Sequence, residues 1–169
     1  RATLPYLHGR VLDVGCGSGA LANHVAPGNY TGVEIDEESL AICRRTHPEH
    51  SFLIELPPPT ERFDTIISLA VIEHVKAPDI FLQELAVRLE DSPESGILIS
   101  TPHPAMDWVH TLGSSVGLFS QHASDEHEEL LDKSALRSLA DAAGLALVDY
   151  RRFMLGANQL ALYRRKPAP

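Results

Sequence analysis

The sequence predicts a single α/β domain, residues 1–169, in which a mostly parallel sheet is covered by helices on both faces. Strand-like and helix-like segments alternate along the chain, a pattern typical of parallel sheets. No internal repeat or low-complexity tract interrupts the 169 residues, enough for one domain that buries roughly 70% of its unfolded surface. Only the last two strand-like segments, 145–150 and 156–163, are joined by a short connection, and we expect them to be antiparallel.

The first strand, residues 11–14, leads directly into a glycine-rich turn. Gly15, Gly17 and Gly19 stand at alternate positions, where glycine adopts positive φ at low cost and has no Cβ to hold a ligand away. The helix-like segment 20–26 follows at once, so we expect unpaired N–H groups at its start to bind a polar ligand. The spacing alone leaves that ligand open, because Gly15-x-Gly17-x-x-Ala20 also fits the dinucleotide fingerprint.

A second strand, residues 30–35, carries Glu34 at its carboxyl end, where open α/β sheets place ligand contacts. A carboxylate there can accept hydrogen bonds from both hydroxyls of a ribose. Asp36 competes for this role, but we expect it to cap the helix that follows.

Between the third and fourth strands, residues 51–54 and 63–69, one helix is expected to be missing. The intervening residues 55–62 are too few for a helical crossover, which takes at least about 10 to 12 residues. We expect the three prolines among them to cross the sheet in extended conformation.

The second half begins with a helix from Pro78 to Leu89 and a fifth strand, residues 96–101. Residues 105–128 then form a long irregular stretch, and loops of that length in a compact domain are usually lids or binding loops. Its histidines, methionine and tryptophan suit a pocket for a small, partly apolar molecule. Asp132 is expected to cap a helix over residues 133–143, which ends at Gly144.

The composition argues against several kinds of partner and location. The net charge is −9, whereas nucleic-acid binding draws its affinity from clustered Lys and Arg, so no nucleic-acid partner is expected. No apolar run approaches the length of a membrane span, and the start has no apolar signal-peptide core. Two cysteines without metal-type spacing fit a reducing cytoplasm.

Three motifs resemble class I S-adenosylmethionine-dependent methyltransferases, in particular small-molecule enzymes of the ubiquinone and menaquinone type. The first is Asp13-Val-Gly-Cys-Gly-Ser-Gly19, in which the acid precedes the glycines by two residues. The second is Phe63-Asp64 followed by Glu73-His74-Val75, and the third is the stretch from His127 into the last long helix. The resemblance covers about residues 10–166 and implies a Rossmann-like, doubly wound sheet of seven strands with one antiparallel strand near the edge.

The resemblance also implies a cofactor, S-adenosylmethionine, with S-adenosylhomocysteine (SAH) as its product. The cofactor-binding residues it implies are Asp13, Gly15, Cys16, Gly17, Glu34, Ile35 and Leu69. Residues 102–128 would bind the acceptor. Relatives usually carry an Asp-containing segment that contacts the adenine, and here Glu55 is the only acid near that position.

A hydroxyl acceptor needs a base, and His is the side chain that titrates near neutrality. His127 matches a family position that often faces the acceptor, and His103 lies between two prolines at the end of the fifth strand, so both are candidate catalytic bases. We expect His74 to pack at a strand-to-helix junction instead. His122 and His127 fit no standard metal spacing, and no metal is expected.

These observations favour methyl transfer to a small-molecule acceptor, with oxygen as the acceptor atom. One alternative is a non-catalytic subunit that binds the cofactor, because the helical segment with which relatives cover the site is expected to be missing before Thr3. The other is an NAD-binding oxidoreductase domain, which would need a substrate domain that this length does not contain. Oligomeric state is not readable from the sequence.

Overall fold

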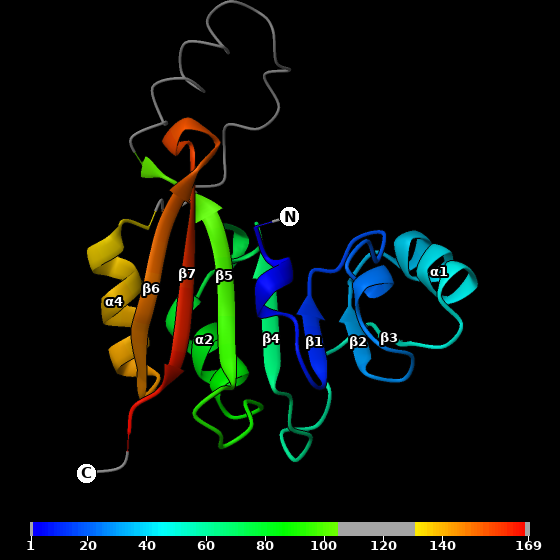
Figure 1. Cartoon of the computed structure of the whole chain (residues 1–169). Coiled ribbons are helices and arrows are strands. Elements are labelled where there is room, and N and C mark those ends of the chain that lie inside the picture. The colour runs from blue at the N-terminus through cyan, green and yellow to red at the C-terminus, as the bar shows by residue number, and fades with distance from the viewer. Residues whose placement is uncertain (1, 105–130, 168–169) are drawn as a thin grey trace, which may run out of the picture.

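Seven strands form one sheet in the order β3-β2-β1-β4-β5-β7-β6 in the computed structural model, which describes residues 2–104 and 131–167 (Figure 1). The strands are β1 (Val11–Val14), β2 (Tyr30–Val33), β3 (Ser51–Leu53), β4 (Thr65–Leu69), β5 (Gly96–Pro102), β6 (Leu145–Phe153) and β7 (Asn158–Arg165). All pairs are parallel except those of β7, which is antiparallel to both β5 and β6. The predicted seven-stranded sheet with one antiparallel strand near its edge is confirmed.

Helices lie on both faces of this sheet. The α-helices are α1 (Glu37–Thr46), α2 (Pro78–Ala86) and α4 (Lys133–Ala142), and the 3-10 turns are η1 (Leu4–Tyr6), η2 (Ala22–His24), η3 (Ile72–His74) and η5 (Met154–Gly156). Leu82 of α2 and Leu136 of α4 belong to the core on one face, and Leu40 of α1 belongs to the core on the other. Within residues 2–104 and 131–167, no helix is long and apolar enough to cross a membrane.

The prediction of a helix over residues 20–26 was wrong. Only the single 3-10 turn η2 forms there. The segment has seven residues between a glycine turn and Pro27-Gly28, too short to offset the cost of helix nucleation. Asn23, His24 and Val25 are also poor helix formers. The glycine turn therefore leads into a tight coil, and the helix N-terminus expected beside the turn does not form.

Helix α2 also ends earlier than expected, at Ala86 instead of Leu89. The backbone of Phe63 explains the difference, because its N–H donates to the carbonyl of Arg88 and its carbonyl accepts from the N–H of Glu90, both at 2.9 Å. Residues after Ala86 thus pair with Phe63, two residues before β4, and cannot continue the helix.

Capping and crossover predictions are confirmed. The carboxylate of Asp36 accepts a hydrogen bond from the Ser39 N–H at 2.9 Å, and that of Asp132 accepts from the Ala135 N–H at 2.8 Å. Residues 54–62 contain no helix. The buried guanidinium of Arg88 holds this crossover by donating from Nε to the Pro57 carbonyl at 2.7 Å.

Candidate functional site

The turn after β1 is shaped by glycines at positive φ. Gly15 has φ of 77°, and a Cβ added to it would lie 2.3 Å from Cγ2 of Val71, so only glycine fits against that side chain. Gly17 has φ of 52°, and an added Cβ would meet nothing within 4 Å. One glycine is therefore required by packing, and the other leaves open space above the turn.

Glu34 lies directly after β2 and joins two segments at the carboxyl end of the sheet. Its carboxylate accepts hydrogen bonds from the Gly17 N–H at 2.9 Å and from the Asp36 N–H at 3.1 Å. A carboxylate offers about four acceptor positions, so about two stay available to a ligand with adjacent hydroxyls. Glu34 follows the carboxyl end of β2, where it was expected, and Asp36 is the helix cap. The contact of Glu34 with a ribose stays a prediction.

Asp13 is 4% exposed on β1, with the Tyr30 hydroxyl donating to its Oδ2 at 2.6 Å. Burial raises the pKa of this carboxyl to about 6; the tyrosine hydrogen bond opposes the shift, and the charge of Glu34 adds to it. The group is thus less acidic than an exposed aspartate and close to a second carboxylate. A buried acid of this kind, beside a glycine turn, is typical of a functional site.

The thiols of Cys43 and Cys16 pack at the glycine turn. Cys43 of α1 donates to the Gly17 carbonyl, with Sγ 3.2 Å from the oxygen. Cys16 lies against Gly32, where an added Cβ would be 2.7 Å from Sγ. Burial raises the pKa of Cys16 to about 12, so this thiol is protonated at neutral pH. The structure gives Cys16 a packing role, and its contact with a cofactor stays a prediction.

Ile35 and Leu69 complete the predicted set at the same edge of the sheet. Ile35 is 82% exposed between Glu34 and Asp36, an apolar side chain beside the carboxylate. Leu69 ends β4 and is partly buried, and the next residue, Ala70, has φ of 56°. Residues other than glycine rarely adopt this conformation, which turns the backbone sharply where β4 ends.

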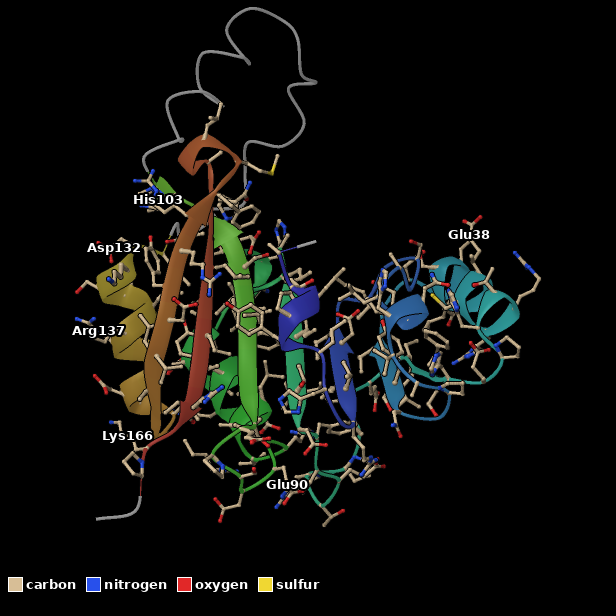
Figure 2. All side chains as sticks on the ribbon, viewed as in Figure 1. Glu38, Glu90, His103, Asp132, Arg137 and Lys166 are labelled. Atoms are coloured by element: carbon tan, nitrogen blue, oxygen red, sulfur yellow. The ribbon has the colours of Figure 1, made fainter. Side chains whose placement is uncertain are left out.

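His103 lies at the end of β5, two strands from β1 in the order of the sheet. Its N–H donates to the Ala157 carbonyl at 2.8 Å. Burial, followed by the charge of Arg152, lowers the pKa of its imidazole. Figure 2 shows His103 with Asp132 on the α4 side of the sheet, across its width from Glu38 on α1.

The rest of the predicted acceptor region lies outside the described residues. That applies to His127, to His122 and to the stretch 105–128 as a whole, so their roles stay predictions. His74 lies in η3, at the expected junction, but it is exposed there, whereas its neighbours Ile72 and Glu73 are buried. In the described part of the chain, no group of three or more His, Cys, Asp or Glu side chains could hold a metal ion.

Sequence reasoning missed three residues that shape the site: Tyr30, Val71 and Cys43. Tyr30 and Val71 look like ordinary apolar positions, and nothing local shows that they meet Asp13 and Gly15. The sequence did contain one weak signal for the packing of the glycine turn. Gly32 lies inside a strand, and a glycine there indicates that another group approaches the backbone closely.

Comparison with known proteins supplies the family. Residues 3–150 match the family model described as a methyltransferase domain. The fatty-acid O-methyltransferase of Mycolicibacterium smegmatis is 30% identical over 158 residues, covering 82% of this chain and 56% of that protein. The ubiquinone biosynthesis O-methyltransferase of Bradyrhizobium diazoefficiens is 31% identical over 102 residues, covering 54% of this chain and 39% of that protein. The chain thus spans about half the length of these curated relatives.

Solved structures agree on the fold. The magnesium protoporphyrin IX methyltransferase of Synechocystis PCC 6803, solved with bound SAH, superposes with a TM-score of 0.69 at 18% identity, covering 98% of this chain and 78% of that one. An S-adenosylmethionine-dependent methyltransferase from Mesorhizobium loti gives 0.73 at 18% identity, with 98% and 95% covered. Together with the family match and the geometry of the glycine turn, these findings show that the chain belongs to the class I S-adenosylmethionine-dependent methyltransferases.

Proposed function

We propose that this chain transfers a methyl group from S-adenosylmethionine to an oxygen atom of a small-molecule acceptor. The observation that carries the proposal is the Glu34 carboxylate, held between the N–H groups of Gly17 and Asp36. That arrangement supports a ribose site directly beside a glycine turn. The names of the relatives, which act on a fatty acid and in ubiquinone biosynthesis, support oxygen as the acceptor atom.

The residues fit the cofactor in charge and in space. The remaining acceptor positions of Glu34 would receive the two ribose hydroxyls, and exposed Ile35 would lie against an apolar part of the ligand. The open space above Gly17 would let the backbone approach the ligand without a side chain between them. When bound, the cofactor supplies a methyl group on a good leaving group, so the protein's main task is to hold the acceptor in line, which can supply roughly 7–11 kcal/mol.

A hydroxyl acceptor would lose its proton to a histidine, and His103 and His127 are the candidates. The lowered pKa of His103 favours the neutral imidazole at pH 7, which is the form that can accept a proton. Its place at the end of β5 supports a role on the acceptor side of the site. The acceptor itself would bind within residues 102–128. A cytoplasmic location and the absence of a nucleic-acid partner stay predictions from composition.

The test is calorimetric titration with SAH and, separately, with NAD. We expect micromolar binding of SAH, weakened at least tenfold by Glu34→Ala, and no binding of NAD. The matched control is Glu38→Ala, which removes an exposed acid of α1 and should leave SAH affinity unchanged. Saturable NAD binding without SAH binding would overturn the proposal. Methyl transfer from labelled S-adenosylmethionine to hydroxylated and carboxylated acceptors then tests the reaction.

A further inference from the structure

Tyr30 is the first residue of β2, and its hydroxyl reaches the carboxylate of Asp13 on the neighbouring strand. The hydroxyl donates to Oδ2 at 2.6 Å, a short distance typical of a hydrogen bond to a charged acceptor. Burial raises the pKa of Tyr30, so the hydroxyl keeps the proton that it donates. Tyr30 is 1% exposed and Asp13 is 4% exposed. In so buried a place, the bond stabilises the ionised carboxylate more than it would in water.

Packing fixes the direction of the Tyr30 hydroxyl. The tyrosine ring contacts His50 edge-on, with the ring centroids 5.4 Å apart, and Phe52 at 5.8 Å. Val11 of β1 is opposite Tyr30, and Val11 and Asp13 point to the same face of the sheet because side chains alternate along a strand. The hydroxyl is therefore held beside the Asp13 carboxylate before any ligand binds.

Asp13 has a second carboxylate close to it. Burial raises the pKa of Asp13, the charge of Glu34 adds to that shift, and the Tyr30 hydrogen bond opposes it. Among the described residues, no Lys or Arg forms an ion pair with Asp13 or Glu34. Two carboxylates at the glycine turn without a cation of their own favour a cationic ligand, and S-adenosylmethionine carries an ammonium group and a sulfonium.

We propose that Tyr30 is a positioning residue for cofactor binding, whose hydroxyl keeps the Asp13 carboxylate ionised and fixed so that its charge attracts the cofactor. The inference rests on the proposed function and adds to it a residue that acts through Asp13. Without the hydroxyl, Asp13 should stay protonated to a higher pH. Cofactor affinity should then fall over the pH range in which the carboxyl has become neutral.

The other titratable groups around this pair are thiols and histidines. The charge of Asp13 reaches Cys16 in the turn and Cys43 on α1, and burial raises the pKa of both thiols, so they stay mainly protonated below about pH 8.5. His50 contacts the tyrosine ring, and the ring of His47 lies 6.4 Å from that of His50. A substitution of Asp13 itself therefore has to separate its titration from that of the histidines.

The test is calorimetric titration with SAH, which carries the ammonium group, at pH values from about 5.5 to about 8.5. Wild type should lose affinity below about pH 6, the pKa of Asp13. Tyr30→Phe should move this loss upward by about one to two pH units, because a hydrogen bond to a charged group is lost. Its affinity should be about two- to tenfold below that of wild type at about pH 7, and within about twofold of it at about pH 8.5.

Tyr163→Phe is the matched control. Tyr163 is also fully buried in the sheet, and its hydroxyl has no hydrogen-bond partner among the described residues. Removal of that hydroxyl should leave the pH profile of SAH affinity unchanged. Asp13→Asn is the second variant. Its SAH affinity should be low and independent of pH over this range, and adding Tyr30→Phe should change it by less than about twofold.

Three results would overturn the inference: an unchanged pH midpoint in Tyr30→Phe, an equal loss of affinity at every pH, or a pH profile that persists in Asp13→Asn. An equal loss at every pH would mean that the hydroxyl serves the fold alone. Absent SAH binding by wild type at every pH overturns the proposed function and this inference with it. Intact SAH binding with any of the three results overturns the role of Tyr30 alone.

Discussion

Gly15 and Gly17 lie two residues apart in one turn, yet we expect alanine to affect them in different ways. Both have positive φ, so each substitution strains the backbone. At Gly15 the new methyl group would also overlap Cγ2 of Val71 at 2.3 Å, whereas at Gly17 it would enter open space. Gly15→Ala should therefore act mainly on stability, and Gly17→Ala mainly on cofactor binding.

The expected losses of stability follow from two contributions, the backbone strain at positive φ and the overlap with Val71. Placing alanine at positive φ costs roughly 1–2 kcal/mol at either position. Overlap with a packed side chain adds about 1–3 kcal/mol at Gly15. We expect Gly15→Ala to lower the free energy of unfolding by about 2–5 kcal/mol and Gly17→Ala by about 1–2 kcal/mol.

Val71→Ala supplies the partner for a double-mutant cycle. It removes Cγ2, leaving the Val71 Cβ at 3.7 Å from the added methyl group, which is ordinary van der Waals contact. In the Val71→Ala background, Gly15→Ala should no longer cause the overlap, and it should lower the free energy of unfolding only through backbone strain. The expected coupling is about 1–3 kcal/mol, well above the scatter of additive pairs.

Urea unfolding of the four proteins of the cycle, and of Gly17→Ala, measures these values, provided that the denaturant slope is unchanged. Calorimetry with SAH on the same proteins should show at least a tenfold loss for Gly17→Ala. Equal destabilisation by the two alanines, or a coupling near zero between Gly15 and Val71, would refute the packing argument. Unchanged SAH affinity in Gly17→Ala would refute the assignment of the open space to the cofactor.

Three further substitutions test the supports of the site. The pKa of the Asp13 carboxyl is about 6 in the folded protein, whereas its ordinary value is 3.8. The folded state therefore binds the proton more tightly than the unfolded state does. The free energy of unfolding should fall as pH rises from about 4 to about 6. Asp13→Asn should remove that pH dependence and raise the free energy of unfolding at pH 7 by up to about 3 kcal/mol. Identical pH profiles of stability for wild type and Asp13→Asn would contradict this prediction. Asp132→Ala should cost about 1 kcal/mol in urea unfolding, restored by Asp132→Ser. Arg88→Met leaves the Pro57 carbonyl unpaired and should lower the free energy of unfolding by about 1–3 kcal/mol.

The predictions that held rest on chemistry within a few residues. Asp36 and Asp132 cap helices because their carboxylates reach N–H groups three positions ahead. The short crossover 55–62 could be predicted from length alone. Glu34 could be placed at the carboxyl end of β2 from the strand pattern alone, whereas its contact with Gly17 is a finding of the structure.

The failures have a different physical origin. Residues 20–26 have the pattern of a helix, but seven residues between a glycine turn and Pro27 are too few to offset the cost of helix nucleation. The contacts of Asp13 with Tyr30 and of Gly15 with Val71 join residues from different strands and turns. Sequence shows that a buried carboxylate needs a partner and that a glycine needs space, but the identity of each partner is fixed only by the register of the sheet.

The distribution of strain gives an independent argument for where function lies. In the described part of the chain, three residues other than glycine have positive φ: Ala70, Met154 and Leu155. Ala70 follows β4 and the other two follow β6, so all three stand at the carboxyl ends of strands that run in one direction. Asp13, with its raised pKa, is near the same end of β1. Such features persist only where the surrounding structure enforces them, so we expect the functional site to lie along this edge of the sheet.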